Sequence, residues 1–227
     1  RRHTRFRNVT GVQTCALPIL KVDAFENYIR GLMAKERGPR VQYFRTADRL
    51  DPRFTKPAFE LGLMYFNDRD YQTSTLWLTK LRRSDPDYLE ANYFLGVAYL
   101  HLGQYERSAS AFRIVEIALP LNEVYNNLGI ALARRDQPGA LQYFEKAHAS
   151  DPADADYNFN LGYTLWKRNE CDKAVGPLGA AIEKLTPSAA APGKAVYADC
   201  LTRLGRQQEA ATVRSEEHTS ELQSRFG

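Results

Sequence analysis

The chain has 227 residues, of which 44% are hydrophobic and 26% charged, with a formal net charge of +4 at pH 7. No stretch approaches the roughly 18 apolar residues that a membrane helix needs, so no membrane span is expected in this fragment. The 3 cysteines and 4 histidines follow no CxxC or metal-ligand spacing. The sequence therefore predicts neither a metal site nor a disulfide framework.

The two ends of the chain are related through their coding DNA. Residues 6–19, back-translated with allowed codons and extended by one base, have a reverse complement that reads RSEEHTSELQSRFG, which is residues 214–227 without a mismatch. Ligating one adapter to both ends of a DNA fragment produces this relation, and the stretch resembles a commonly used sequencing-library adapter. We expect 1–19 and 214–227 to be adapter-derived, with 1–19 disordered, and set both aside.

The remaining reading, Leu20 to Val213, is almost neutral. Without the six arginines and three glutamates of the ends, it carries 25 basic and 24 acidic residues. A basic surface for nucleic-acid phosphates is therefore not expected. Because we expect the native N-terminus to be missing, the compartment stays open between the cytoplasm and the bacterial periplasm.

A period of about 34 residues runs through the chain. The dipeptide Leu-Gly recurs with spacings of 34, 33 and 33, at Leu61-Gly62, Leu95-Gly96, Leu128-Gly129 and Leu161-Gly162. An X-Pro step follows the same beat, at Asp51-Pro52, Asp85-Pro86, Leu119-Pro120, Asp151-Pro152 and Thr186-Pro187. One repeated unit therefore organises the chain.

Each unit is predicted to be a pair of helices. A degenerate pair with a turn at Gly38-Pro39 is expected first, at 20–52. Four regular pairs follow, at 53–86, 87–120, 121–152 and 153–187. A truncated pair is expected at 188–213, after the segment TPSAAAPG. Apolar residues return at helical spacing in the first helices, AFELGLMYF, YFLGVAYL, YNNLGIAL and FNLGYTLW. The second helices are predicted at DYQTSTLWLTKL, QYERSASAFRIV, GALQYFEKA and CDKAVGPLGAAI. Each X-Pro is expected to end a second helix, since proline holds the preceding residue extended, and Pro177 predicts a kink.

The in-phase glycines predict close helix crossings. Glycine inside a helix costs up to about 1 kcal/mol relative to alanine, so its recurrence indicates that a side chain is excluded there. Small residues are expected on the paired helix, with Ser74 and Ser108 in the earlier units and Ala140 and Ala174 in the later ones.

This pattern closely resembles the tetratricopeptide repeat: Leu-Gly, small residues, a leucine or phenylalanine (Leu78, Phe112, Phe144, Leu178) and a closing proline. The resemblance implies an all-α fold, a right-handed α-solenoid of about five to six stacked antiparallel helix pairs. It also implies a concave surface lined by the first helices.

Transferring the family's concave positions predicts a partner-binding groove with aromatic anchors and a partly basic edge. Its residues are Phe59, Phe66, Tyr93, Leu100, His101, Asn126, Arg134, Phe159, Tyr163, Trp166 and Lys167. Aromatic side chains bury large areas at interfaces, and Arg or Lys can meet a carboxylate. Packing between repeats is the competing role for these aromatics, and we assign Tyr65 and Tyr99 to the core. Glu90, Glu123 and Asp156 are expected to form a solvated acidic rim.

Members of the family that hold chaperone tails clamp a terminal carboxylate with Lys and Asn. The corresponding positions hold Phe59, Leu63, Tyr93 and Val97, which cannot donate, and only Asn127 matches. The sequence therefore disfavours a heat-shock-protein adaptor.

No enzymatic constellation is predicted: the glycines lie within helices rather than in a phosphate-binding loop, and no Ser/His/Asp or HExxH arrangement is present. His148 is expected at a helix surface, and Cys171 in a packing role rather than as a reactive thiol. We expect no enzyme activity, cofactor or small-molecule substrate.

Three functions remain in view. The first is a protein-interaction scaffold that binds a peptide or helix of a partner in the groove. The second is an interaction or regulatory region of a larger bacterial envelope or signalling protein, since AFENYIRGL resembles segments that lead into such repeats. The third, base-by-base RNA reading, is disfavoured by near neutrality, so a protein or peptide partner and no nucleic acid is expected.

Overall fold

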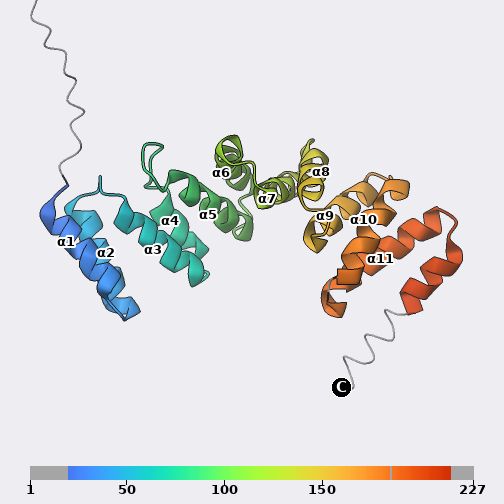
Figure 1. Ribbon diagram of the computed structural model, residues 1–227, viewed down its shortest axis with the longest axis horizontal. Coiled ribbons are helices and arrows are strands. Elements are labelled where there is room, and N and C mark those ends of the chain that lie inside the picture. Colours follow the sequence, from blue (N-terminus) through green and yellow to red (C-terminus); the bar gives the residue numbers. More distant parts are fainter. Residues whose placement is uncertain (1–19, 185, 216–227) are drawn as a thin grey trace, which may run out of the picture. The chain divides into compact units, whose positions relative to one another are not determined.

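The computed structural model describes residues 20–184 and 186–215 (Figure 1). The predicted adapter-derived segments 1–19 and, apart from Arg214 and Ser215, 214–227 lie outside the described residues. Every regular element in the described ranges is a helix, which confirms the predicted all-α class. The chain divides into two compact units, with the boundary between Ala58 and Phe59.

The first unit contains α1 (Val22–Met33), α2 (Arg37–Leu50) and the start of α3 (Lys56–Asn67). A Cβ on Gly31 would lie 2.5 Å from the ring of Phe44, so glycine is what lets α1 and α2 meet. The predicted turn at Gly38-Pro39 is wrong, because both residues lie in the first turn of α2. Proline is tolerated there, since the N–H that it lacks has no partner within the helix.

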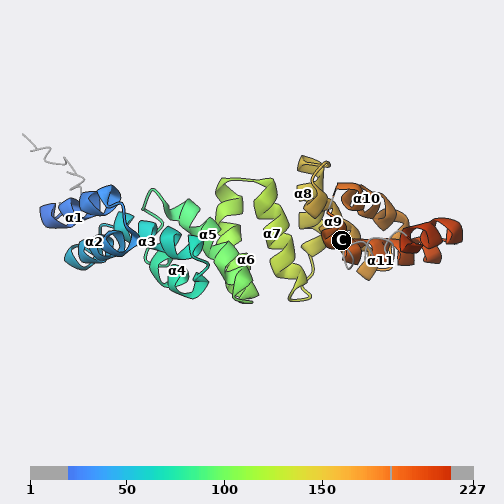
Figure 2. The ribbon, with the colours of Figure 1, turned by 90° about the horizontal axis from the view of Figure 1, so that it is seen from below.

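The second unit is a series of helix pairs that follow one another along the chain (Figure 2). After α3 come α4 (Tyr71–Leu78), α5 (Tyr88–His101), α6 (Tyr105–Ala118), α7 (Asn122–Ala133), α8 (Ala140–Ser150), α9 (Ala155–Lys167), α10 (Cys171–Lys184) and α11 (Pro187–Arg203). Residues 207–215 are also helical. The closest packing is within the pairs α5–α6, α7–α8 and α9–α10, and α4, α6, α8 and α10 each pack on the first helix of the next pair.

The X-Pro steps at Asp51, Leu119 and Asp151 end second helices as predicted, whereas Asp85-Pro86 lies in the connection after α4. Leu119 has φ −138° and ψ 97°, and Asp151 has φ −142° and ψ 88°, so both leave the helix in an extended conformation before a proline. One helix ends early: α4 stops at Leu78, short of the predicted Leu81, and Leu81 is buried in the turn that follows.

Proline does not interrupt the last two labelled helices. α10 runs from Cys171 to Lys184 as one helix that includes Pro177. The helix therefore continues past the proline at which a kink was expected. The segment TPSAAAPG is helical from Pro187 onward and makes α11 a helix of 17 residues, with Pro192 inside it. The first turns of α11 therefore extend along α9, where they reach the candidate site described below.

The glycines of the second unit occupy helix crossings, as predicted. A Cβ on Gly96 would lie 2.7 Å from the ring of Phe112, and one on Gly129 would lie 2.7 Å from the ring of Phe144. Gly62 and Gly162 face Leu78 and Leu178 in the same way. The large residue of each second helix thus sits in the space that the glycine leaves open, which decides how closely the pair approaches.

Serine adds a hydrogen bond at two of these crossings. The hydroxyl of Ser74 donates to the carbonyl of Gly62 at 2.9 Å, and that of Ser108 to the carbonyl of Gly96 at 2.8 Å. Both serines are fully buried. Ala140 and Ala174 fill the equivalent positions in the later units, where no hydroxyl can donate.

Ser108→Ala is expected to lower the free energy of unfolding by up to about 1 kcal/mol. The lost hydrogen bond contributes roughly 0.5–1.5 kcal/mol, and the higher helix propensity of alanine offsets part of it. Denaturant unfolding followed by circular dichroism measures the change. Ser110→Ala is the control, because Ser110 is exposed on the same helix; equal effects of the two substitutions would contradict the role of the buried bond.

The expectation that the chain forms no disulfide is wrong for Cys171 and Cys200. Cys171, the first residue of α10, and Cys200 in α11 are bonded, with their Cα atoms 5.0 Å apart. Both are buried. Spacing could not reveal the pair, because only the stacking of α10 on α11 brings together two residues 29 positions apart.

Candidate functional site

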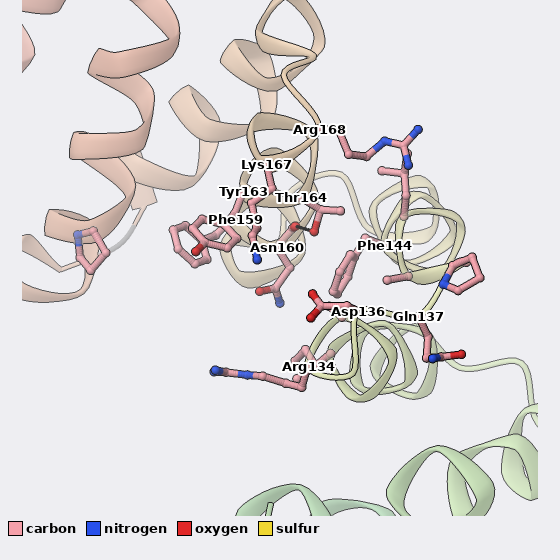
Figure 3. Close-up of a pocket in the computed structure, with 17 residues that line it drawn as sticks. Arg134, Asp136, Gln137, Phe144, Phe159, Asn160, Tyr163, Thr164, Lys167 and Arg168 are labelled. Carbon is pink, nitrogen blue, oxygen red and sulfur yellow. Dashed lines mark hydrogen bonds between the residues drawn. The ribbon is translucent and has the colours of Figure 1, made fainter. Parts of the chain in front are cut away.

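A cavity of about 910 Å³ opens between the α7–α8 pair and α9 (Figure 3). It is lined by the end of α7, the turn after it, the start of α8, one face of α9 and Pro192 of α11. The lining residues are Ile130, Ala133, Arg134, Asp136, Gln137, Pro138, Gly139, Ala140, Leu141, Phe144, Phe159, Asn160, Tyr163, Thr164, Lys167, Arg168 and Pro192. Its size falls within the range of ligand-binding pockets, about 300–1,000 Å³.

Three aromatic side chains of α9 form one row, which is the part of the predicted groove that the structure brings together. The ring centroids of Phe159 and Tyr163 are 5.8 Å apart, and those of Tyr163 and Trp166 are 5.4 Å apart. Residues four and three apart lie on the same face of a helix, which explains the row. Tyr163 is 37% exposed and Phe159 lies beside it, so both offer apolar surface at the cavity.

Trp166 is held by α11. Its indole Nε1 donates to Asp199 Oδ2 at 2.6 Å, and Asp199 also pairs with Arg203 at 2.7 Å. Arg203 in turn donates to the side chain of Asn169 at 2.8 Å. The polar end of Trp166 is therefore occupied within the protein, and the residue does not line the cavity.

The start of α11 closes one side of the cavity. Pro192 lines it, and a Cβ on Gly193 would come within 3.4 Å of the Phe159 ring. The absence of a side chain at Gly193 lets α11 approach this ring. The TPSAAAPG segment thus completes the wall beside the aromatic row.

Charged side chains surround the apolar surface. Arg134 caps the C-terminal end of α7, Lys167 is the last residue of α9, and both are exposed. Neither makes an ion pair within the described ranges, whereas Arg168 is paired with Glu170 at 2.7 Å. Asp136 is the one carboxylate among the described lining residues, and it adopts a left-handed backbone conformation with φ 50°.

In the first half of the predicted groove, three of the predicted residues contact neighbouring aromatic rings, although His101 stays exposed. The ring of Phe66 lies 4.9 Å from that of Phe94, and His101 is stacked on Tyr71 at 4.3 Å. Tyr93 packs on Phe112, with ring centroids 6.1 Å apart. Leu100 is half-buried against the same core. These contacts agree with the alternative interpretation, in which the aromatic residues pack between repeats instead of binding a partner.

Two predicted groove residues are buried. Phe59 is 5% exposed and Asn126 is 7% exposed, so neither side chain is offered to a partner. Asn126 instead accepts a hydrogen bond from Asn160 Nδ2 at 2.9 Å, which links α7 to α9. Sequence position alone could not separate these two from the exposed members, because burial depends on the neighbouring pair.

Sequence reasoning missed the side chains that the turn and α8 supply. Asp136, Gln137 and Phe144 line the cavity together with Asn160 and Thr164 of α9. Phe144 was assigned only to the helix crossing, yet part of its ring borders the cavity (Figure 3). The additional residues in the turn before Pro138 were the sequence feature that could have indicated these side chains. The sequence of a turn, however, does not show which surface its side chains face.

The opposite ends of the first helices are acidic. Glu90, Glu123 and Asp156 are all exposed, as expected of a solvated rim. Burial, followed by the carboxylates of Glu123, Asp154 and Asp151, raises the pKa of Tyr157 to about 12. Its hydroxyl therefore stays neutral at physiological pH. Acidic residues favour helix N-termini on physical grounds, so this rim requires no ligand.

Among the described residues, no group of three or more His, Cys, Asp or Glu side chains is placed to hold a metal ion. Nor is any described helix both long and apolar enough to cross a membrane. The cavity lining offers aromatic surface, amide side chains and two cations that make no ion pair within the described ranges.

Stacked helix pairs with a glycine at each crossing define the second unit as an α-solenoid of the repeat-protein class. The family model of the tetratricopeptide repeat matches residues 59–123 and 127–190, more than half of the chain. The chain belongs to the tetratricopeptide repeat family. Its repeats are those of protein-interaction scaffolds, and no catalytic family is indicated.

Several solved structures share the fold. MamA from Desulfovibrio magneticus RS-1 is 21% identical with a TM-score of 0.63, and the match covers 72% of this chain and 96% of that one. Another MamA structure is 19% identical, with a TM-score of 0.66 and coverages of 76% and 94%. YrrB, described as a TPR protein with an unusual peptide-binding site, is 17% identical, with a TM-score of 0.65 and coverages of 82% and 98%. No curated protein sequence matches the chain.

Proposed function

We propose that the protein is an interaction scaffold that holds an extended peptide or a helix of a partner protein against α7 and α9, with the cavity as the anchoring point. The observation that carries this proposal is the cavity of about 910 Å³ with Tyr163 and Phe159 open to it. Exposed aromatic surface in a concave site is the usual source of binding energy at protein interfaces.

The proposal keeps only the second half of the predicted groove, on α7 and α9, as the partner-binding surface. Arg134, Phe159, Tyr163 and Lys167 all line the cavity, whereas Phe66, Tyr93 and His101 pack with neighbouring rings. A partner is expected to make its main contacts with the first group. A polypeptide suits the site better than nucleic acid, because the cations are few and aromatic surface dominates.

Tyr163→Ala is expected to weaken peptide binding by about tenfold or more, because it removes an exposed ring from the middle of the site. Peptides selected from a random display library against the full chain serve as probes, and fluorescence polarisation measures their dissociation constants. Trp166→Ala is a poorer test, since the loss of its bond to Asp199 would also loosen α11.

Ile117→Ala is the matched control. Ile117 is an 86% exposed apolar residue on α6, outside the cavity, so its removal should leave affinity unchanged. Peptides that bind equally well to the wild type and to Tyr163→Ala would place the binding surface elsewhere and refute the proposal.

A further inference from the structure

We infer that the cavity accepts an acidic segment of the partner, with a carboxylate against Arg134 and Lys167 and a neighbouring apolar side chain beside Phe159 and Tyr163. The inference rests on the proposed function and adds the chemistry of the bound segment.

The two cations are the first reason. Arg134 and Lys167 come from the ends of α7 and α9 and border the same cavity. Each sits at a helix C-terminus, where a cation is favoured without any ligand. Both line the cavity that Phe159 and Tyr163 also line, and neither makes an ion pair within the described ranges, which points to an anionic partner.

The third cation of the lining behaves differently. Arg168 donates from its Nε to Glu170 at 2.7 Å, and the same carboxylate accepts from Lys173 at 2.8 Å. These bonds lower the pKa of Glu170, so it remains ionised and keeps Arg168 occupied. Arg134 and Lys167 are therefore the lining cations that make no ion pair within the described ranges; the Nζ of Lys167 lies over the Tyr163 ring, 6.0 Å from its centroid.

The carboxylate of Asp136 disfavours an anionic partner and so limits the preference of the cavity for an acidic segment. Its carboxylate points toward Asn160 across the cavity (Figure 3). The lining thus holds two cations without an ion pair in the described ranges and one carboxylate, so the local balance favours an acidic segment over a basic one. Backbone N–H groups of the bound segment can donate to Asp136, since every extended peptide carries such donors.

The apolar lining of the cavity explains why an acidic side chain alone does not suffice for affinity. Ile130, Leu141 and Phe144 line the side opposite Phe159 and Tyr163. An apolar or aromatic side chain placed between these walls is removed from water on both faces, which supplies affinity. The carboxylate then fixes the orientation of the segment, because long-range charge complementarity mainly governs specificity.

The test uses random peptides displayed against the full chain. We expect the selected peptides to combine Asp or Glu with an adjacent aromatic residue or leucine. A synthetic selected peptide should bind about tenfold or more tightly than its counterpart with every Asp and Glu replaced by Lys, and the difference should shrink with added salt.

Charge reversal in the protein completes the test. The double variant Arg134→Glu/Lys167→Glu is expected to lose about tenfold or more in affinity for the acidic peptide and to gain affinity for its lysine counterpart. Arg82→Glu/Arg83→Glu is the control: it makes the same change in net charge in the α4–α5 connection and should leave both affinities unchanged. Circular dichroism and denaturant unfolding verify that both variants fold.

The inference is overturned if selected peptides show no acidic preference, or if the two double variants weaken binding equally. The proposed function survives that result as long as Tyr163→Ala still weakens peptide binding by about tenfold or more. Selection of no peptide at all, or binding that ignores Tyr163, would overturn both.

Discussion

Gly96→Val is expected to lower the free energy of unfolding by about 3 kcal/mol or more. A Cβ at this position would lie 2.7 Å from two atoms of the Phe112 ring, closer than folded proteins tolerate. Phe112 is fully buried and packed against Tyr93, so its ring cannot swing away without disturbing the next contact. The two γ-methyl groups of valine enlarge the clash and restrict the side chain further.

Gly96→Ala separates packing from helix propensity. Alanine gains up to about 1 kcal/mol over glycine in a helix, so a net loss of stability shows that the clash outweighs this gain. Gly179→Ala in α10 is the matched control, because its added Cβ would have ordinary contacts of 3.5 Å or more and should be neutral or stabilising.

Denaturant unfolding of the three variants measures these effects. In a Phe112→Ala background the cost of Gly96→Ala should largely disappear, because the atoms that clash are gone. A Gly96→Ala variant as stable as the wild type would show that the crossing has slack, and the packing role of the repeated glycine would then be refuted.

Breaking the disulfide is expected to have the second large effect. The double variant Cys171→Ala/Cys200→Ala should lose about 3–4 kcal/mol of stability, estimated from the entropy of closing a loop of this length. The bond joins residues 29 positions apart and ties α10 to α11. The loss is therefore expected to be largest in α11, which hydrogen exchange can localise.

Reductant provides the matched comparison. Wild-type protein should lose similar stability when it is reduced, whereas the double alanine variant should not respond to reductant. Loosening of α11 should also release the Trp166–Asp199 bond and the packing of Gly193 on Phe159, so peptide affinity is expected to fall with it. Freely reactive thiols at Cys171 and Cys200 in unreduced protein, with stability unaffected by reductant, would contradict this account.

Much of the fold could be predicted because its signals are local. Leu-Gly and X-Pro steps at a fixed period specify where each helix pair begins and ends, and the match to the tetratricopeptide repeat family confirms the interpretation. Two of the errors occurred where proline has two roles. Pro39 and Pro187 lie in the first turns of helices, where proline is tolerated, and a sequence pattern alone reads such a residue as a break.

The sequence by itself determined the class of protein, since each repeat carries its own helix periodicity, its own glycine and its own terminating proline. The tertiary structure decided which concave positions stay open. Tyr93 and Phe159 occupy the same repeat position, three residues before the glycine, yet Tyr93 packs on Phe112 while Phe159 lines a cavity. The pairing of Cys171 with Cys200 and the placement of Pro192 beside α9 likewise depend on how α11 stacks. Stacking brings together side chains that lie far apart in the sequence. No local sequence pattern encodes the distance between two neighbouring helix pairs.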